Sequence, residues 1–151
     1  MRIMKKLVYL FTCLALCCFV SCERSEPETI IGKWQWVSSE YEYYMNGELV
    51  DKEFDDFSHE EDYIIYVEFT ADGVMKMIDV YEGEVTEQKM NYSQVGSEIY
   101  LQLGMNPDEQ PKMIITKLTK TELQLTSEMP EAGPDGNALI AVQKMNLVRV
   151  Q

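Results

Sequence analysis

Basic residues are scarce in this sequence. Lys and Arg together number 13 against 26 Asp and Glu, which gives a formal net charge of −13 at pH 7. A protein that binds nucleic acid needs a basic patch that releases counterions from the phosphates. The lysines of this chain are scattered, so we expect no nucleic acid partner.

Cysteine is absent after residue 22. The four cysteines stand at positions 13, 17, 18 and 22. The 130 residues from position 22 to 151 can therefore form no disulfide among themselves and must depend on a hydrophobic core. A chain of that length forms one domain that buries roughly two-thirds of its unfolded surface. It leaves no room for a second domain.

Histidine occurs once, at His59, inside the acidic run 55–62. A Ser-His-Asp arrangement would need this residue, but its neighbour Ser58 is too close in sequence for that geometry, and the run is typical of a solvated loop. The carboxylate spacing matches no calcium-binding loop. We therefore expect no enzyme, no metal and no cofactor. A carboxylate pair for glycoside hydrolysis stays open in so acidic a chain, although nothing singles out a pair.

A long apolar run is also missing. The longest, residues 7–20, has 14 residues without charge, whereas a membrane-spanning helix needs about 20. It follows a positively charged start and precedes a small residue, Ser21, as in a secretory signal peptide. We therefore expect residues 1–21 to be a signal peptide that is removed.

The signal ends in Phe19-Val20-Ser21-Cys22, which resembles the lipobox of bacterial lipoproteins, with Phe in place of the usual Leu. The resemblance implies that the Cys22 thiol is lipidated and that acyl chains such as palmitate anchor the protein to a membrane. Two or three chains make the anchor effectively permanent, whereas one binds only marginally. Ordinary secretion without lipid is the alternative.

Residue Glu23 is not the aspartate that retains some lipoproteins in the inner membrane. We therefore expect an outer-membrane anchor with the domain facing the periplasm or the cell surface. Residues 22–29 would form a lipidated tether and residues 30–151 the globular domain. Removal of residues 1–21 leaves ten basic and 26 acidic residues, a formal charge of about −16.

Helical periodicity is nearly absent, and strand signals recur about every ten residues. Asn46-Gly47 is a strong two-residue hairpin turn. The residue pattern places Ile99, Leu101 and Leu103 inward. Strands are predicted over 34–41, 48–54, 63–70, 74–81, 85–94, 98–105, 112–118, 122–127 and 138–150, with a loop over 130–137. One apolar face and no covering helix favour an all-β fold, an antiparallel up-and-down barrel of about eight strands.

The opening Ile31-Gly32-Lys33-Trp34 matches the Gly-x-Trp start of lipocalins. With Phe69-Thr70-Ala71-Asp72-Gly73 and 115–119, it resembles the lipocalin-like domains of bacterial lipoproteins over about residues 30–150. The resemblance implies that Gly32, Trp34 and Arg149 close one end of the barrel, with the guanidinium over the indole, a contact worth about 0.5–2 kcal/mol. A second lipocalin motif and a late helix are missing, so ligand binding does not carry over with the fold.

An eight-stranded barrel is either filled by its own side chains or holds one small molecule. Seven strand residues are candidates to line a ligand: Tyr66, Met75, Met77, Tyr81, Met90, Tyr92 and Tyr100. Their alternative role is core filling, or a polar tip that reaches solvent. Two functions therefore stay open: binding of a small apolar or amphipathic molecule in the barrel, or a filled barrel that docks a protein or glycan at the cell envelope. A void of about 300–1,000 Å³ would favour the first.

Overall fold

The computed structural model of the protein describes residues 28–60, 62–104, 111–133 and 138–150. The expected signal peptide, Cys22 and most of the tether lie outside the described residues. Within the described part, no helix is long and apolar enough to cross a membrane. Nine strands form the fold: β1 Gly32–Met45, β2 Glu48–Asp56, β3 Tyr63–Phe69, β4 Val74–Tyr81, β5 Glu84–Val95, β6 Glu98–Gln102, β7 Lys112–Leu118, β8 Glu122–Ala132 and β9 Ala138–Arg149.

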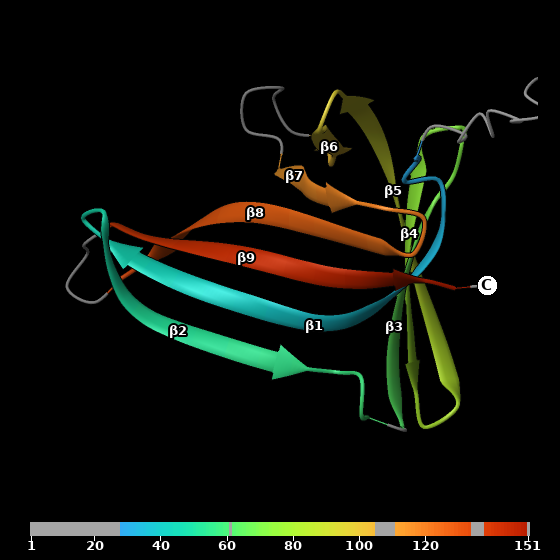
Figure 1. Cartoon of the computed structure of the whole chain (residues 1–151), viewed down its shortest axis with the longest axis horizontal. Coiled ribbons are helices and arrows are strands. Elements are labelled where there is room, and N and C mark those ends of the chain that lie inside the picture. The colour runs from blue at the N-terminus through green and yellow to red at the C-terminus, as the bar shows by residue number, and fades with distance from the viewer. Residues whose placement is uncertain (1–27, 61, 105–110, 134–137, 151) are drawn as a thin grey trace, which may run out of the picture.

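The strands form one antiparallel sheet that closes on itself. The sheet order is β2-β1-β3-β4-β5-β6-β7-β8-β9, and β1 also pairs with β9. Strands β1 and β3 to β9 thus make a closed eight-stranded barrel, and β2 is an extra strand outside it (Figure 1). The predicted all-β antiparallel barrel of about eight strands is confirmed.

Strand β1 is shared between the barrel and a projection from it. Its first part, residues 32–36, pairs with β3, and its second part, residues 38–45, pairs with β2. Strands β8 and β9 run alongside this second part. The sheet β2-β1-β9-β8 projects away from β3 to β7 in Figure 1. We call this projection the arm, made of residues 38–56, 126–132 and 138–146.

The arm turns at the predicted position. Asn46 and Gly47 have φ of 52° and 83°, the pair of positive values that a type I′ hairpin requires. Asparagine and glycine tolerate these values with little strain, so the short turn fixes the register of β1 against β2.

A bulge in β1 decides which side chains face inward. Val37 is the extra residue, because Trp36 pairs with Leu147 and Ser38 pairs with Asn146. The backbone N–H of Phe57 donates to the Val37 carbonyl over 2.9 Å. As a result, strict alternation fails here, and the inward face continues after Trp36 at Ser39 instead of Ser38.

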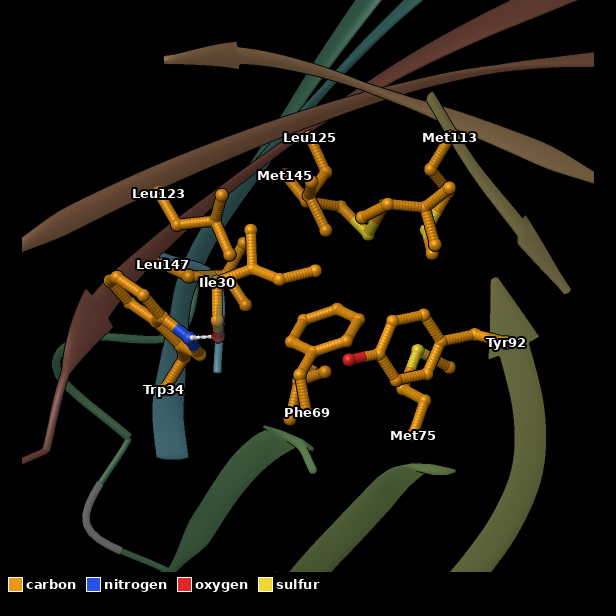
Figure 2. Close-up of a cluster of buried hydrophobic side chains, with 12 residues drawn as sticks. Ile30, Trp34, Phe69, Met75, Tyr92, Met113, Leu123, Leu125, Met145 and Leu147 are labelled. Carbon is orange, nitrogen blue, oxygen red and sulfur yellow. Dashed lines mark hydrogen bonds between the residues drawn. The ribbon is translucent and has the colours of Figure 1, made fainter. Parts of the chain in front are cut away.

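One apolar cluster fills the barrel near the start of β1 (Figure 2). Trp34 is fully buried, and its Nε1 donates to the Ile30 carbonyl over 2.7 Å. The rings of Phe69 and Tyr92 meet edge to face, 5.3 Å between centroids. The cluster also contains Val67, Met75, Ile99, Met113, Leu123, Leu125, Met145 and Leu147. Each large side chain buried here contributes about 1.5–3 kcal/mol, which is how the fold stands without a disulfide.

Two local predictions were wrong. Strand β6 ends at Gln102, and Leu103 is 47% exposed instead of pointing inward. Strand β8 continues through Pro130 to Ala132, where a loop was expected. Proline is tolerated there because β7 pairs with β8 only as far as Ser127, so its missing N–H lies in an edge segment.

Candidate functional site

Arg149 closes one end of the barrel. Its guanidinium carbon lies 4.1 Å from the centroid of the Trp34 ring, the place that the family resemblance implies for it. The same group donates three hydrogen bonds to backbone carbonyls, to Thr29 over 2.7 Å, Ile31 over 3.0 Å and Lys120 over 2.8 Å. Arg149 therefore ties the start of the domain to the turn before β8, a structural role.

Gly32 is required by this closure. Its φ is +131°, and a Cβ added to it would lie 2.6 Å from the Arg149 Nη1 atom. A side chain here would be strained by the backbone conformation and would displace the Arg149 guanidinium from its hydrogen bond to Ile31.

The seven ligand candidates from the sequence separate into three places. Met75 and Tyr92 are buried in the apolar cluster, and Met90 packs against it. Tyr66 and Tyr100 lie on the outer wall, because they alternate along their strands with the buried residues Ile65, Val67 and Ile99. Met77 and Tyr81 face inward beyond the cluster, where they pair with Val67 and Tyr63 on the neighbouring strand.

The outer tyrosines have partners of their own. The Lys33 Nζ atom lies 4.0 Å from the centroid of the Tyr66 ring. The Tyr100 hydroxyl donates to Glu98, which also binds Lys112 over 3.0 Å. Neither tyrosine can reach a ligand in the interior.

Beyond the cluster, four aromatic rings follow one another in contact. Trp36 meets Phe57 at 5.9 Å between centroids, Phe57 meets Tyr63 at 6.4 Å, and Tyr63 meets Tyr81 at 6.2 Å, each pair edge to face. Burial raises the pKa of Tyr63, with a smaller effect of the nearby charges. Tyr81 is 57% exposed, so the row of rings runs from the barrel interior to solvent.

A buried polar cluster continues this row onto the arm. The Trp36 Nε1 atom donates to Ser39 Oγ over 3.1 Å, and Gln143 Nε2 donates to the same oxygen over 3.2 Å. Gln143 Nε2 also donates to the Tyr41 hydroxyl over 2.8 Å. Ser39 and Gln143 are buried, and their hydrogen bonds remove the cost of burying polar groups.

The row ends on two stacked tyrosines. The rings of Tyr41 and Tyr43 lie 6.5 Å apart and nearly parallel, at 15°. The Tyr43 hydroxyl donates to Glu53 over 3.0 Å. This hydrogen bond, burial and the charges of Glu53 and Glu131 raise the pKa of Tyr43, so the hydroxyl stays protonated as a donor.

We call these contacts together the aromatic track. It consists of Tyr81, Tyr63, Phe57, Trp36, Ser39, Gln143, Tyr41 and Tyr43. Rings that bury apolar area and a few fixed polar groups that orient a ligand are the usual composition of a small-molecule site.

Sequence reasoning missed most of this track. It selected Tyr81 but not Trp36, Tyr43, Phe57 or Tyr63. The two-residue spacing of Tyr41 and Tyr43 was a usable signal for rings on one face of a strand. The bulge at Val37, which turns these rings inward, has no comparable signal.

The acidic segment after β2 carries the single histidine. Ser58 Oγ donates to Asp56 Oδ1 over 2.6 Å, and the largely exposed His59 has its Nε2 atom 3.9 Å from the same carboxylate. Ser58 and His59 thus both face Asp56, and they do not pair with each other as a nucleophile and its general base. In the described residues, no three His, Cys, Asp or Glu side chains are gathered as metal ligands.

A shallow pocket of about 190 Å³ lies over β7, β8 and β9. Its lining includes Gln124 and Asn146, whose side chains bond to each other over 2.9 Å on the outer face. This pocket is smaller than ordinary ligand sites, which begin at about 300 Å³, and it is not connected to the aromatic track by any shared residue.

Comparison with known proteins places the fold in a family. No curated protein matches the sequence significantly. Among solved structures, the chain is similar to a protein of unknown function from Nostoc punctiforme, of the DUF3598 family, with 11% identity and a TM-score of 0.40. The match covers 83% of this chain and 51% of that protein, so the chain spans about half its length. The family profile described as a lipocalin-like domain matches residues 30–125, and the chain therefore belongs to the lipocalin-like domain family.

Proposed function

We propose that this protein is a lipid-anchored binding protein of the bacterial cell envelope that takes a small amphipathic molecule along the aromatic track. The observation that carries the proposal is the continuity of the track, from the exposed ring of Tyr81 to the stacked pair Tyr41 and Tyr43. Its rings offer apolar area, and Gln143 and Glu53 offer polar contacts at fixed positions.

The apolar cluster fills part of the barrel interior and leaves the aromatic track as the place where a ligand could bind. Met75, Met113 and Met145 are buried in the apolar cluster with Leu125. A ligand would therefore lie beyond this cluster, along the aromatic track. The Tyr41 hydroxyl accepts from Gln143. Its own proton has no acceptor among the described residues, so it can donate to a ligand oxygen.

The envelope part of the proposal rests on the sequence. The signal-like start and the lipobox-like Cys22 favour an outer-membrane lipid anchor, with the domain in the periplasm or on the cell surface. We propose binding without catalysis, and the contacts of Ser58 and His59, which both face Asp56, support this. No cofactor and no nucleic acid partner are part of the proposal.

A second candidate function is a filled barrel that docks a protein or glycan at the envelope. The density of the apolar cluster favours it, because twelve buried residues from all around the barrel pack together there. In this alternative the stacked tyrosines would serve a large partner instead of a small molecule.

The first test is native mass spectrometry of the protein extracted from its own host in a mild detergent. We expect a bound small molecule, and we expect amphipathic compounds from a thermal-shift screen to raise the unfolding temperature. Replacing Tyr41 and Tyr43 by Ala should weaken binding about tenfold or more, because each ring contributes roughly 1 kcal/mol or more of contact.

The matched control replaces Tyr66 and Tyr100 by Ala, which removes two tyrosines from the outer wall. These variants should bind as the unmodified protein does. The proposal is wrong if neither a bound mass nor a stabilising compound is found, or if the outer-wall variants lose binding equally.

A further inference from the structure

Strand β2 is a free sheet edge. Among the described residues it pairs with β1 alone and ends the sheet order. In an antiparallel strand, about half of the backbone N–H and C=O groups point away from the paired neighbour, and such an edge can accept a further strand. All nine residues of β2 are exposed, so nothing in the described chain covers it.

The two faces of this edge differ in chemistry. Asp51, Glu53 and Asp55 pair with Tyr43, Tyr41 and Ser39, so the three carboxylates share the inner face of the arm. Phe54 and Leu49 pair with Glu40 and Tyr44 and lie on the outer face. Phe54 is 65% exposed and Leu49 is 47% exposed, which is unusual for two large apolar side chains on one short strand.

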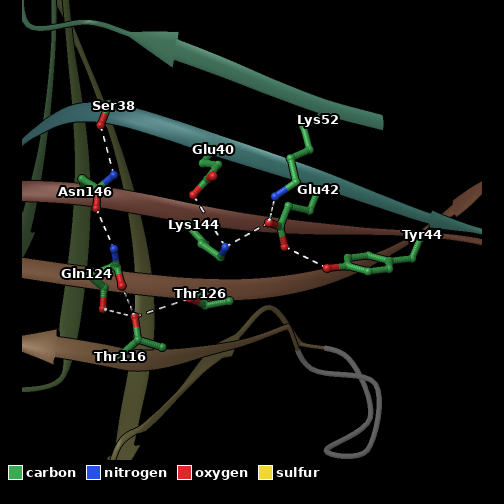
Figure 3. A network of polar contacts seen from close by, with 10 residues as sticks. All are labelled: Ser38, Glu40, Glu42, Tyr44, Lys52, Thr116, Gln124, Thr126, Lys144 and Asn146. Atoms are coloured by element: carbon green, nitrogen blue, oxygen red, sulfur yellow. Dashed lines mark hydrogen bonds and ion pairs between the residues drawn. The ribbon is translucent and has the colours of Figure 1, made fainter. Parts of the chain in front are cut away.

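Two carboxylates of the outer face, Glu40 and Glu42, have lysine partners, whereas none of the ion pairs in the described residues includes Asp51, Glu53 or Asp55. Glu42 binds Lys52 over 2.5 Å and Lys144 over 3.3 Å, and Lys144 also lies 3.6 Å from Glu40 (Figure 3). Several described residues of β1, β2, β8 and β9 lie on the same face of the arm as Tyr41. None of them is a Lys or an Arg.

A second copy of this chain does not fit the edge. An antiparallel pair of β2 strands would bring two rows of carboxylates against each other, and like charges directly opposite destabilise a strand pair. The row of carboxylates therefore opposes self-association through this edge, as charges on natural edge strands do. A strand with basic side chains on the same face would fit instead.

We propose that the free edge of β2 binds an extended segment of a partner protein by strand addition, and that this segment alternates basic and apolar residues. Its basic side chains lie beside Asp51, Glu53 and Asp55, and its apolar side chains lie on the face of Phe54, within the part of β2 that follows the bulge at Val50. Main-chain hydrogen bonds supply affinity, and the alternation supplies specificity. This docking does not rest on the small-molecule proposal, because it needs no residue of the aromatic track. The two proposals share only Glu53, which accepts a hydrogen bond from Tyr43.

The test uses the protein as its host processes it, with a synthetic peptide of the length of β2 that alternates Lys and Val. We expect saturable binding in calorimetry that weakens as salt is raised, because screening acts on exposed charges. Hydrogen exchange followed by mass spectrometry should show new protection in residues 48–56. A peptide of the same composition with all lysines at one end should bind at least about tenfold more weakly, because it cannot place one residue type on each face.

The variant D51K/D55K reverses two charges on the inner face of β2 and should weaken peptide binding about tenfold or more. The matched control E84K/E128K makes the same change in net charge at exposed positions of β5 and β8. It should leave binding within about twofold. The proposal is overturned if the alternating peptide does not bind, if the segregated peptide binds equally well, or if protection appears outside β2. A small-molecule ligand found on the track would leave these outcomes unchanged.

Discussion

At the scale of single residues, Arg149 does more than the resemblance implied. The contact with Trp34 could be expected from the order of motifs along the chain. The three hydrogen bonds to carbonyls of Thr29, Ile31 and Lys120 could not, because they depend on where the backbone of two distant segments comes together. The planar guanidinium suits both tasks, since it stacks on a ring while its edge donates.

Replacing Gly32 by Ala should lower the free energy of unfolding by about 1–3 kcal/mol, because it adds strain at positive φ and a clash with Arg149. Urea unfolding measures the loss. The control is Gly83→Ala, where φ is +84° but no atom lies within 4 Å, so only the backbone cost of roughly 1 kcal/mol remains.

Placing Gly32→Ala in an Arg149→Lys background separates the two causes. Lysine removes the Nη1 atom that the new methyl group would meet, so the additional cost of Gly32→Ala should shrink toward that of Gly83→Ala. Equal costs in both backgrounds would show that Arg149 does not constrain Gly32.

At the scale of elements, strand positions and the pairing of consecutive strands were predictable, but the place of β2 outside the barrel was not. Alternation in residues 63–69 and the turn at Asn46-Gly47 gave β3 and the β1–β2 hairpin. The sequence 48–56 has no regular alternation of apolar and polar residues, and this was the available sign that β2 would leave the barrel. The aromatic track was hidden by the bulge at Val37, because one extra residue exchanges the two faces of a strand.

The outer face of the arm makes stability depend on pH through Glu42. Hydrogen bonds from Lys52, Tyr44 and Lys144 lower the pKa of this carboxyl from 4.5 to about 2. A lowered pKa in the folded state means that the unfolded chain binds the proton more readily. The stabilisation is therefore present above pH 4.5 and is lost as the pH falls from 4.5 toward 2.

Glu42→Gln should make the free energy of unfolding less dependent on pH in this window and lower it at neutral pH. Urea unfolding at a series of pH values measures both effects. The matched control is Glu84→Gln, an exposed carboxylate on β5 outside this network, which should keep the slope of the unmodified protein. An unchanged slope in Glu42→Gln would contradict the assignment of this titration to Glu42.

At the scale of the whole molecule, the two ends of the domain differ in structure. The chain enters the barrel at the Arg149 closure, where the Thr29 carbonyl is bound. Strand β1 then runs 14 residues to the arm tip, about 45 Å at the usual rise per residue. With the anchor that we propose at Cys22, a tether of a few residues would hold the closed end near the membrane. The arm, with the aromatic track and the free edge of β2, would extend away from it toward ligands and partners.

Replacing Cys22 by Ser should therefore release the protein from the membrane fraction and abolish its labelling by palmitate, because no other part of the proposal supplies an anchor. Two or three acyl chains, at about 0.8 kcal/mol per buried methylene, hold far more strongly than any contact of so acidic a domain. The released domain should keep the thermal unfolding midpoint and the peptide binding of the anchored form, since the tether contributes to neither. The control Cys18→Ser removes a cysteine from the expected signal peptide and should leave labelling intact. Continued labelling and membrane retention of the Cys22→Ser protein would reject the anchor. A loss of peptide binding on release would show that binding depends on the membrane instead of on the free edge of β2 alone.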